Sequence, residues 1–74
     1  MNLADVPEGR KVKVLRVAGS SDIKQRMLDM GVMPATEIKV ERYAPLLDPI
    51  HIKLKGYSLA LRVSEGKNIE VEYC

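Results

Sequence analysis

Hydrophobic and polar residues alternate along much of this chain, and a period of two is typical of β-strands with one buried face. Over residues 11–17, Val12 and Val14 alternate with lysines before Leu15 and Val17 shift to the other phase. This shift predicts a bulge or a strong bend in the first strand. Alternation also predicts strands over 36–43, 50–55, 58–63 and 69–73. The residues expected to face the core from these later strands are Ile38, Val40, Ile50, Ile52, Leu54, Leu59, Leu61, Val63, Ile69, Val71 and Tyr73.

One segment has a helical period instead. Ile23, Met27 and Met30 are spaced at i, i+4 and i+7, which places them on one face of a helix predicted over 22–30. An isolated helix of about two to three turns is unstable in water, so this face is expected to pack on the sheet.

Both ends of this helix carry boundary signals. Asp22 followed by Gln25 is typical of an N-terminal capping box, and the serines directly before Asp22 are alternative caps. Gly31 is placed for a left-handed C-terminal cap, and Pro34 prevents the helix from resuming.

Five short strands with one short helix between the first two predict a mostly β fold, a small closed barrel. Closure removes the exposed sheet edges that so short a chain could not otherwise cover. Residues 64–68 are expected to form a turn or a single helical turn, and Leu3 and Val6 to pack against the body. At 74 residues the chain is expected to form one domain, over 1–74.

The composition limits how stable such a domain can be. A chain of this length buries about 60% of the surface that its unfolded form exposes. The chain has no Phe and no Trp, so mainly aliphatic and Met side chains must form a thin core. A thin core favours association, and a homo-oligomer therefore stays open as an alternative to a monomer.

Charge and cysteine content narrow the classes of function. A net charge of +2 is small for a strong binder of nucleic acid or of a membrane surface, so neither partner is expected. The single Cys, Cys74, excludes an intrachain disulfide and fits a reducing compartment. No signal-peptide pattern is present, and no apolar run approaches the roughly 18 residues of a membrane span. These features predict a cytoplasmic protein without membrane insertion.

Residues suited to catalysis do not form a recognised motif. A zinc site usually has about four ligands, most of them Cys sulfur or His nitrogen atoms. A single His and a single Cys cannot supply them. The serines stand in turn or strand-start contexts, and no glycine-rich phosphate loop with Lys and Ser or Thr is present. The sequence therefore predicts a binding or regulatory module that is not an enzyme and needs no cofactor.

The loop over 44–49 is the first candidate for a binding surface. Its two prolines restrict the backbone, which lowers the entropy that the loop loses on binding. Neighbouring leucines in such a loop do not both point inward easily. We expect Leu46 to plug the end of the barrel, Leu47 to be an exposed apolar anchor, and Asp48 to cap the turn.

Met33 is a second candidate, because it lies after the predicted helix and before Pro34, where exposure is expected. Flexible thioethers suit adaptable contact surfaces. Met27 and Met30, by contrast, are expected to pack in the core.

A basic cluster at the first strand supports a different class of function. Arg10, Lys11, Lys13 and Arg16 lie close together in the sequence, as in a small barrel that binds RNA. Acidic residues elsewhere nearly cancel this charge, and no aromatic stacking platform accompanies the cluster. RNA binding through these residues is the alternative to a protein partner.

Five short motifs, in order and covering nearly the whole chain, resemble those of the FeoA family, small cytoplasmic proteins of bacterial ferrous-iron uptake. Each motif is weak alone, and their order and spacing carry the resemblance. The motifs are Arg26-Met27-Leu28-Asp29-Met30-Gly31-Val32, Met33-Pro34, Ala44-Pro45-Leu46-Leu47-Asp48-Pro49-Ile50, Ser58-Leu59-Ala60-Leu61-Arg62 and Ile69-Glu70-Val71.

The resemblance implies an SH3-like β-barrel and an accessory or regulatory role. It also implies a partner, the membrane permease FeoB, whose cytoplasmic portion carries a GTP-binding domain. The hypothesis is a non-catalytic adaptor that docks on this portion. The residues expected at the contact are Leu46, Leu47 and Asp48 of the loop, Met33 as a neighbour of the loop, and Arg62.

Arg26 and Arg62 fit the family pattern, and an arginine supplied in trans can stabilise the charge of phosphoryl transfer. Structural ion pairs with Asp29 or Glu65 are the expected alternative role for both arginines. Direct Fe²⁺ binding stays a third possibility for the protein. It requires carboxylates to converge with the single histidine, and the candidates are His51, Glu41, Asp48 and Glu72.

Two residues depart from the family pattern. Ala35 replaces the usual glycine after Pro34, and a positive φ at this position would strain an alanine by about 1 kcal/mol or more. Leu47 replaces the usual glycine of the Pro-Leu-Gly-Asp-Pro loop. This second change alters the geometry open to the loop and adds an apolar side chain, which predicts a different specificity or self-association.

Overall fold

A computed structural model describes residues 1–46 and 48–74 of the chain. The strands lie close to their predicted positions, and two short helical turns accompany the predicted helix. In chain order the elements are η1 (Leu3–Asp5), β1 (Lys11–Val17), α1 (Ser21–Asp29), β2 (Glu37–Tyr43), β3 (Ile50–Leu54), β4 (Tyr57–Leu61), α2 (Val63–Gly66) and β5 (Ile69–Tyr73).

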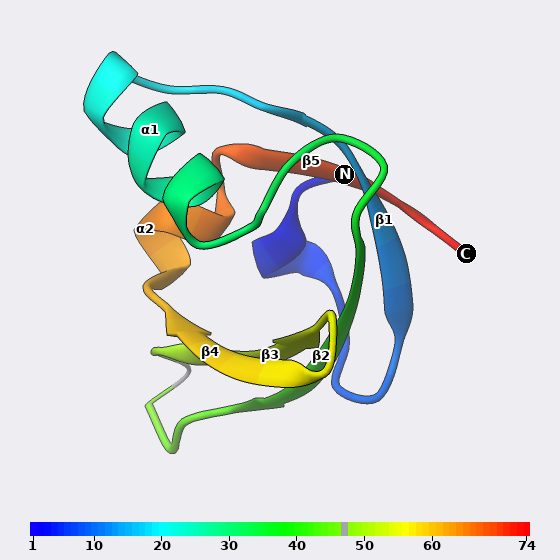
Figure 1. The fold of residues 1–74 in the computed structure, drawn as a ribbon. Helices are drawn as coiled ribbons and strands as arrows, with labels where there is room; N and C mark the ends of the chain where they lie inside the picture. Colours follow the sequence, from blue (N-terminus) through cyan, green and yellow to red (C-terminus); the bar gives the residue numbers. More distant parts are fainter. Residues whose placement is uncertain (47) are drawn as a thin grey trace.

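The five strands form one antiparallel sheet in the order β4-β3-β2-β1-β5. The sheet curls around a central core, as Figure 1 shows. Its ends, β4 and β5, are joined by α2 and are not paired with each other in the part of the chain that the structure describes. The first residues protect the free edge of β5, because the Val71 N–H donates to the Met1 carbonyl at 2.9 Å and Asn2 forms a bridge with Glu70. The predicted closed barrel is thus a strongly curved sheet with a covered edge.

The predicted irregularity of the first strand is confirmed. The register of β1 against β5 shifts between Val14 and Arg16. Leu15 and Val17 were both expected to turn inward after the shift. Leu15 is 43% exposed, and only Val17 packs against the core. A second register shift, in β2 between Val40 and Arg42, has no counterpart in the sequence prediction.

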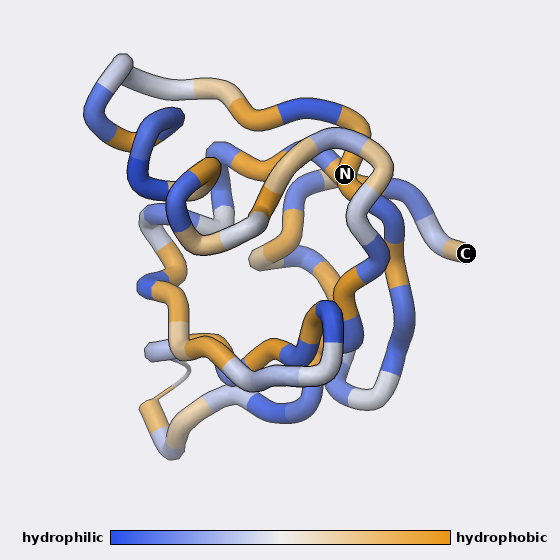
Figure 2. The backbone as a smooth tube through the Cα atoms, in the orientation of Figure 1, coloured by the Kyte–Doolittle hydropathy of each residue, from blue (hydrophilic) through white to orange (hydrophobic). Residues whose placement is uncertain are grey.

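Buried aliphatic residues and one methionine fill the interior. Figure 2 shows how hydrophobic and hydrophilic positions alternate along the strands that enclose this core. Leu59 and Val63 pack at its edge as half-buried residues, and the predicted inward position of Tyr73 is wrong, since this residue is 42% exposed. The buried hydrophobic residues are Leu3, Val6, Val12, Val14, Met27, Val32, Ile38, Val40, Ile50, Ile52, Leu54, Leu61, Ile69 and Val71.

The helix α1 packs as its period predicts, and its N-terminal cap is one of the two predicted alternatives. Met27 is fully buried, and Ile23 and Met30 are half-buried against the core. The cap is Ser20, whose hydroxyl oxygen accepts the Ile23 N–H at 3.3 Å. Of the two predicted alternatives, the serine cap is confirmed and the capping box of Asp22 and Gln25 is wrong, because the chain leaves its extended conformation at Ser20.

The C-terminal end of α1 is held from β4. Gly31 has a φ of 85°, which confirms the predicted left-handed cap. The Tyr57 hydroxyl donates to the Met30 carbonyl at 2.6 Å. A Cβ atom at position 31 would lie 2.7 Å from this hydroxyl oxygen, so a side chain there would displace it.

Ala35 adopts the conformation that its position in the family pattern suggested. Its φ of 73° lies in the left-handed region, which costs an alanine about 1 kcal/mol. Two backbone hydrogen bonds hold it there: the Ala35 N–H donates to the Val14 carbonyl at 2.8 Å, and the Thr36 N–H donates to the Met33 carbonyl at 3.1 Å.

Candidate partner-binding surface

The loop between β2 and β3 exposes an apolar side chain. The base of the loop is closed by the Ala44 N–H, which donates to the Pro49 carbonyl at 3.0 Å. Leu46 is 90% exposed, so its predicted role as a plug of the barrel is wrong and its predicted role as a contact is sterically open. Leu47 lies outside the described residues, and its role as an anchor stays a prediction.

Asp48 ties this loop to the start of α2. One of its carboxylate oxygens accepts the Val63 N–H at 3.0 Å. The predicted turn cap is thus a contact across the fold, because residues 48 and 63 are brought together by the return of the chain through β3 and β4. The carboxylate therefore positions the loop that carries Leu46.

Arg62 lies at the same end of the molecule. A hollow of ≈ 310 Å³ is lined by side chains from the loop, β4, α1 and α2. The Arg62 side chain is exposed and has no ion pair with the described residues, whereas its backbone N–H donates to Glu65 at 3.0 Å. The lining residues are Arg26, Asp48, Pro49, Ala60, Arg62 and Glu65.

The expected structural ion pair is formed by Arg26 and not by Arg62. The Arg26 Nε atom lies 3.1 Å from a carboxylate oxygen of Glu65, which is only 8% exposed. The other oxygen of Glu65 accepts the Arg62 N–H, so this carboxylate serves α1 and the start of α2 together. Arg62, whose side chain is exposed, lines the same hollow as Asp48.

Met33 lies on a different surface from the loop. It is half-buried and lines a mainly apolar hollow together with Leu28, Val32 and Pro34, between the end of α1 and β1. Figure 1 shows the segment after α1 on the opposite side of the barrel from the loop between β2 and β3. The prediction that Met33 neighbours Leu46 is wrong, because β2 carries the chain across the whole sheet between them.

Leu28 contributes to this apolar hollow although sequence reasoning overlooked it. It is 52% exposed and lies off the helix face formed by Ile23, Met27 and Met30. The signal that could have found it is a leucine on the polar side of an otherwise amphipathic helix.

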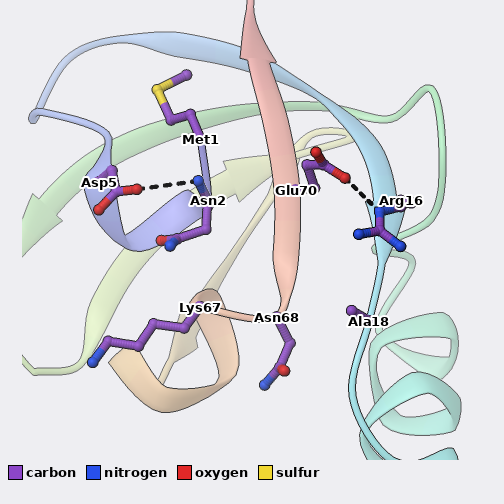
Figure 3. Close-up of a pocket in the computed structure, with 8 residues that line it drawn as sticks. All are labelled: Met1, Asn2, Asp5, Arg16, Ala18, Lys67, Asn68 and Glu70. Atoms are coloured by element: carbon purple, nitrogen blue, oxygen red, sulfur yellow. Dashed lines mark hydrogen bonds and ion pairs between the residues drawn. The ribbon is translucent and has the colours of Figure 1, made fainter.

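A polar hollow near the first residues was also absent from the prediction (Figure 3). Arg16 forms an ion pair with Glu70 there, and its hydrogen bond and charge hold the pKa of the Glu70 carboxyl below its usual range. The Asn2 N–H donates to Asp5 at 3.2 Å, while the Asn2 side-chain oxygen has no partner among the described residues. The ion pair joins β1 to β5, and the bridge between Asn2 and Glu70 attaches the N-terminal residues to β5.

The FeoA-domain family model matches residues 1–73. The chain belongs to the FeoA family. A relative from Porphyromonas gingivalis, the Fe(2+) transport protein A/Fe(2+) transporter FeoB fusion protein, is 33% identical over 72 residues. The match covers 97% of this FeoA-family chain but 8% of the fusion protein, most of which therefore lies outside the match.

Solved structures confirm the predicted fold. The FeoA-like protein from Clostridium acetobutylicum is 44% identical, with a TM-score of 0.92 over 99% of this chain and 85% of that one. The FeoA of Stenotrophomonas maltophilia, described as an SH3 domain protein, is 24% identical, with a TM-score of 0.84 over 97% and 89% of the two chains. The FeoA-family chain is an SH3-like barrel, and its relatives link the family to ferrous-iron transport.

The basic cluster at β1 of this FeoA-family chain is largely engaged within the molecule. The Arg10 guanidinium lies 4.0 Å from the centre of the Tyr73 ring, and the Lys11 ammonium lies 3.8 Å from Glu37. Arg16 pairs with Glu70, as above. No observation on these residues favours RNA as their partner.

The ligands that direct iron binding would need do not converge in the described residues. No group of three or more His, Cys, Asp or Glu side chains there could hold a metal ion. His51 is half-buried on β3, opposite Ala60 of β4, and Cys74 is exposed. Within the same part of the chain, no helix is long and apolar enough to cross a membrane.

Proposed function

We propose that this FeoA-family chain is a non-catalytic accessory protein of ferrous-iron uptake that acts in the cytoplasm by contact with the GTP-binding part of a FeoB-type permease. The observation that carries the proposal is the fusion protein of P. gingivalis, in which a related domain and FeoB form one polypeptide. Fusion raises the effective concentration of one module at the other, which benefits modules that touch. We infer that this chain makes the corresponding contact with the GTP-binding part of its own permease.

The surface around the loop between β2 and β3 suits this contact. Leu46 supplies an exposed apolar side chain, and Arg62 supplies an exposed cation at the same end of the barrel. Asp48 holds the loop against α2 through the Val63 N–H, so the loop loses less entropy when it binds. An apolar anchor beside an arginine is a common arrangement at the centre of a protein interface.

The test is calorimetric titration of this protein into the purified cytoplasmic GTP-binding part of the matching permease, with the GTP and GDP forms compared. Leu46→Asp should weaken binding about tenfold or more, because it places a charge where an apolar group is buried. Leu15→Asp is the matched control, since Leu15 is also exposed but lies on β1. Absence of binding in both nucleotide states, or equal weakening by the two variants, would contradict the proposal.

The role of Arg62 is tested in the same titration with Arg62→Gln. Loss of a cation that pairs with the partner should weaken binding about fivefold to tenfold and reduce its dependence on salt. Arg26→Gln is the comparison, because Arg26 pairs with Glu65 inside the molecule and its loss should lower stability more than affinity. An unchanged affinity of Arg62→Gln would remove this residue from the contact.

Met33 defines whether the contact extends beyond the loop. Its hollow lies on a separate surface, so Met33→Asp should leave binding unchanged if the partner covers the loop end alone. A loss equal to that of Leu46→Asp would show that the partner covers both surfaces.

A further inference from the structure

Three lysines form a row across the outer face of the sheet. In the register of the sheet Lys11 of β1 lies opposite Lys39 of β2, and Lys39 lies opposite Lys53 of β3. All three are exposed, since the residues next to them along each strand point into the core. Lys55 follows directly after β3 and is exposed as well.

These four lysines surround one hollow of ≈ 300 Å³. Its remaining lining residues are Glu37 and Leu54. Glu37 is the single acidic residue among the described residues of the lining, and its carboxylate forms a long ion pair of 3.8 Å with the Lys11 ammonium. The lining therefore combines four lysines with one glutamate, although the Lys55 ammonium itself lies toward Gly31.

The row places like charges opposite each other in the sheet. Side chains directly opposite each other on antiparallel strands have Cβ atoms about 5 Å apart, and like charges at such positions destabilise a sheet. Two lysine pairs of this kind adjoin each other through Lys39. An anion in the hollow would relieve the repulsion of both pairs.

The chemistry of the lining points to phosphate. A lysine ammonium is a compact point charge that binds phosphate oxygens, and a row of lysines matches the several charges of an oligophosphate. Among the described residues no aromatic side chain lines the hollow, so a nucleobase has no ring there to stack on. We propose that the hollow between Lys11, Lys39, Lys53 and Lys55 binds an oligophosphate chain, either free or as part of a nucleotide. This inference goes beyond the proposed contact with FeoB and does not depend on it.

The test is titration of the whole protein with inorganic triphosphate at low salt. Calorimetry and amide chemical shifts monitor the binding. Binding should shift the amides of Lys39 and Lys53 and should raise the melting temperature. The double variant Lys39→Gln/Lys53→Gln should weaken binding about tenfold, since two surface ion pairs to the phosphate chain are lost. The matched control is Lys24→Gln/Lys67→Gln, which removes the same charge from exposed lysines outside the hollow and should bind as the unchanged protein does.

A measurement without ligand gives an independent test. Removing the central lysines should raise the melting temperature of the unliganded double variant, because the like-charge pairs are gone. A lower melting temperature would show that the row is not under repulsion, and would overturn the electrostatic basis of the proposal.

The source of the phosphate is distinguished by further probes. Inorganic triphosphate and nucleoside triphosphates of different bases should bind with similar affinity, because the hollow recognises the phosphate chain. Equal weakening by both double variants would show attraction by net charge alone and would overturn the site. A hexaglutamate peptide or an RNA oligomer that binds more tightly than triphosphate, with the same sensitivity to the Lys39 and Lys53 changes, would overturn phosphate-chain recognition in favour of that macromolecule.

Discussion

The two connections that flank β2 contrast sharply. The segment between α1 and β2 is anchored by backbone hydrogen bonds to β1 and by the Tyr57 hydroxyl on the Met30 carbonyl. The loop between β2 and β3 is closed at its base and tied by Asp48, but it presents Leu46 almost fully to solvent. Both segments contain Pro and apolar residues, so this composition alone does not separate an anchoring turn from a contact loop. What separates them is whether the apolar side chains find a neighbouring element to pack on.

The largest expected effect breaks the anchored segment. Gly31→Ala forces an unfavourable φ and places a Cβ atom against the Tyr57 hydroxyl, so it should lower the free energy of unfolding by about 2 kcal/mol. Gly56→Ala is the control, because φ at Gly56 is 84° but nothing lies within 4 Å of its added Cβ, and it should cost about 1 kcal/mol. Urea unfolding measures both. Equal losses would show that the contact with Tyr57 contributes nothing.

The second effect concerns Tyr43, where β2 ends and the exposed loop begins. Its single hydroxyl proton is shared between the backbone carbonyls of Val6 and Ala4, the latter at 3.2 Å, so Tyr43→Phe should cost about 1 to 2 kcal/mol in urea unfolding. This result would show that the hydrogen bonds of Tyr43 fix the end of β2 from which the exposed loop begins. An unchanged stability would show that these hydrogen bonds do not fix the end of β2.

The same hydroxyl predicts a pH dependence. Burial, followed by the charges of Asp5 and Glu8, raises the pKa of Tyr43 above the ordinary value of about 10. The unfolded chain therefore loses this proton at a lower pH than the folded chain does. The stability that Tyr43 contributes is fully present below the pKa that it has in the unfolded chain. This contribution is lost as the pH rises through the higher pKa of the folded protein. Above a pH of about 9, the free energy of unfolding should fall more steeply with pH for the unchanged protein than for Tyr43→Phe. Urea unfolding at a series of pH values measures both slopes.

A smaller effect of opposite sign is expected at Ala35. Ala35→Gly relieves the strain of φ at 73° but increases the flexibility of the unfolded chain, and the balance should stabilise the protein by about 0.5 kcal/mol. Thermal unfolding measures the change. A destabilised variant would show that the hydrogen bonds of the anchored segment, and not the conformation of Ala35, decide its stability.

The smallest effect on stability is expected at the exposed loop. Leu46→Ser should change the free energy of unfolding by less than about 0.5 kcal/mol, because the side chain is 90% exposed. The same variant should still weaken the proposed contact with the permease. A large loss of stability would contradict the contrast between the two segments.

The strands and the core could largely be predicted because one buried face imposes a period of two, as at Val12, Val14, Ile38 and Val40. The helix was predicted by the spacing around Met27. The cap at Ser20 could not be separated from its polar neighbours, since each of these residue types can accept the same hydrogen bond.

The candidate surface was predicted only in part, because it depends on which distant segments meet. Arg62 and Asp48 line one hollow, as the predicted surface requires, but Met33 lines a different hollow. The lysine row was not visible in the sequence, since Lys11, Lys39 and Lys53 become neighbours only through the register of β1, β2 and β3. Local pattern predicts which face of a strand is exposed, and topology decides which exposed residues are neighbours.

The carboxylate of Glu65 gives this small barrel a mechanical link between its two separated surfaces. One oxygen holds Arg26 of α1, the helix whose end forms the apolar hollow at Met33, and the other holds the backbone of Arg62 beside the exposed loop. A displacement of α1 must therefore either carry the start of α2 with it or break the contact of Glu65 with one of its two partners. Shortening this linkage by one methylene, as in Glu65→Asp, would uncouple the two surfaces while leaving the charge in place.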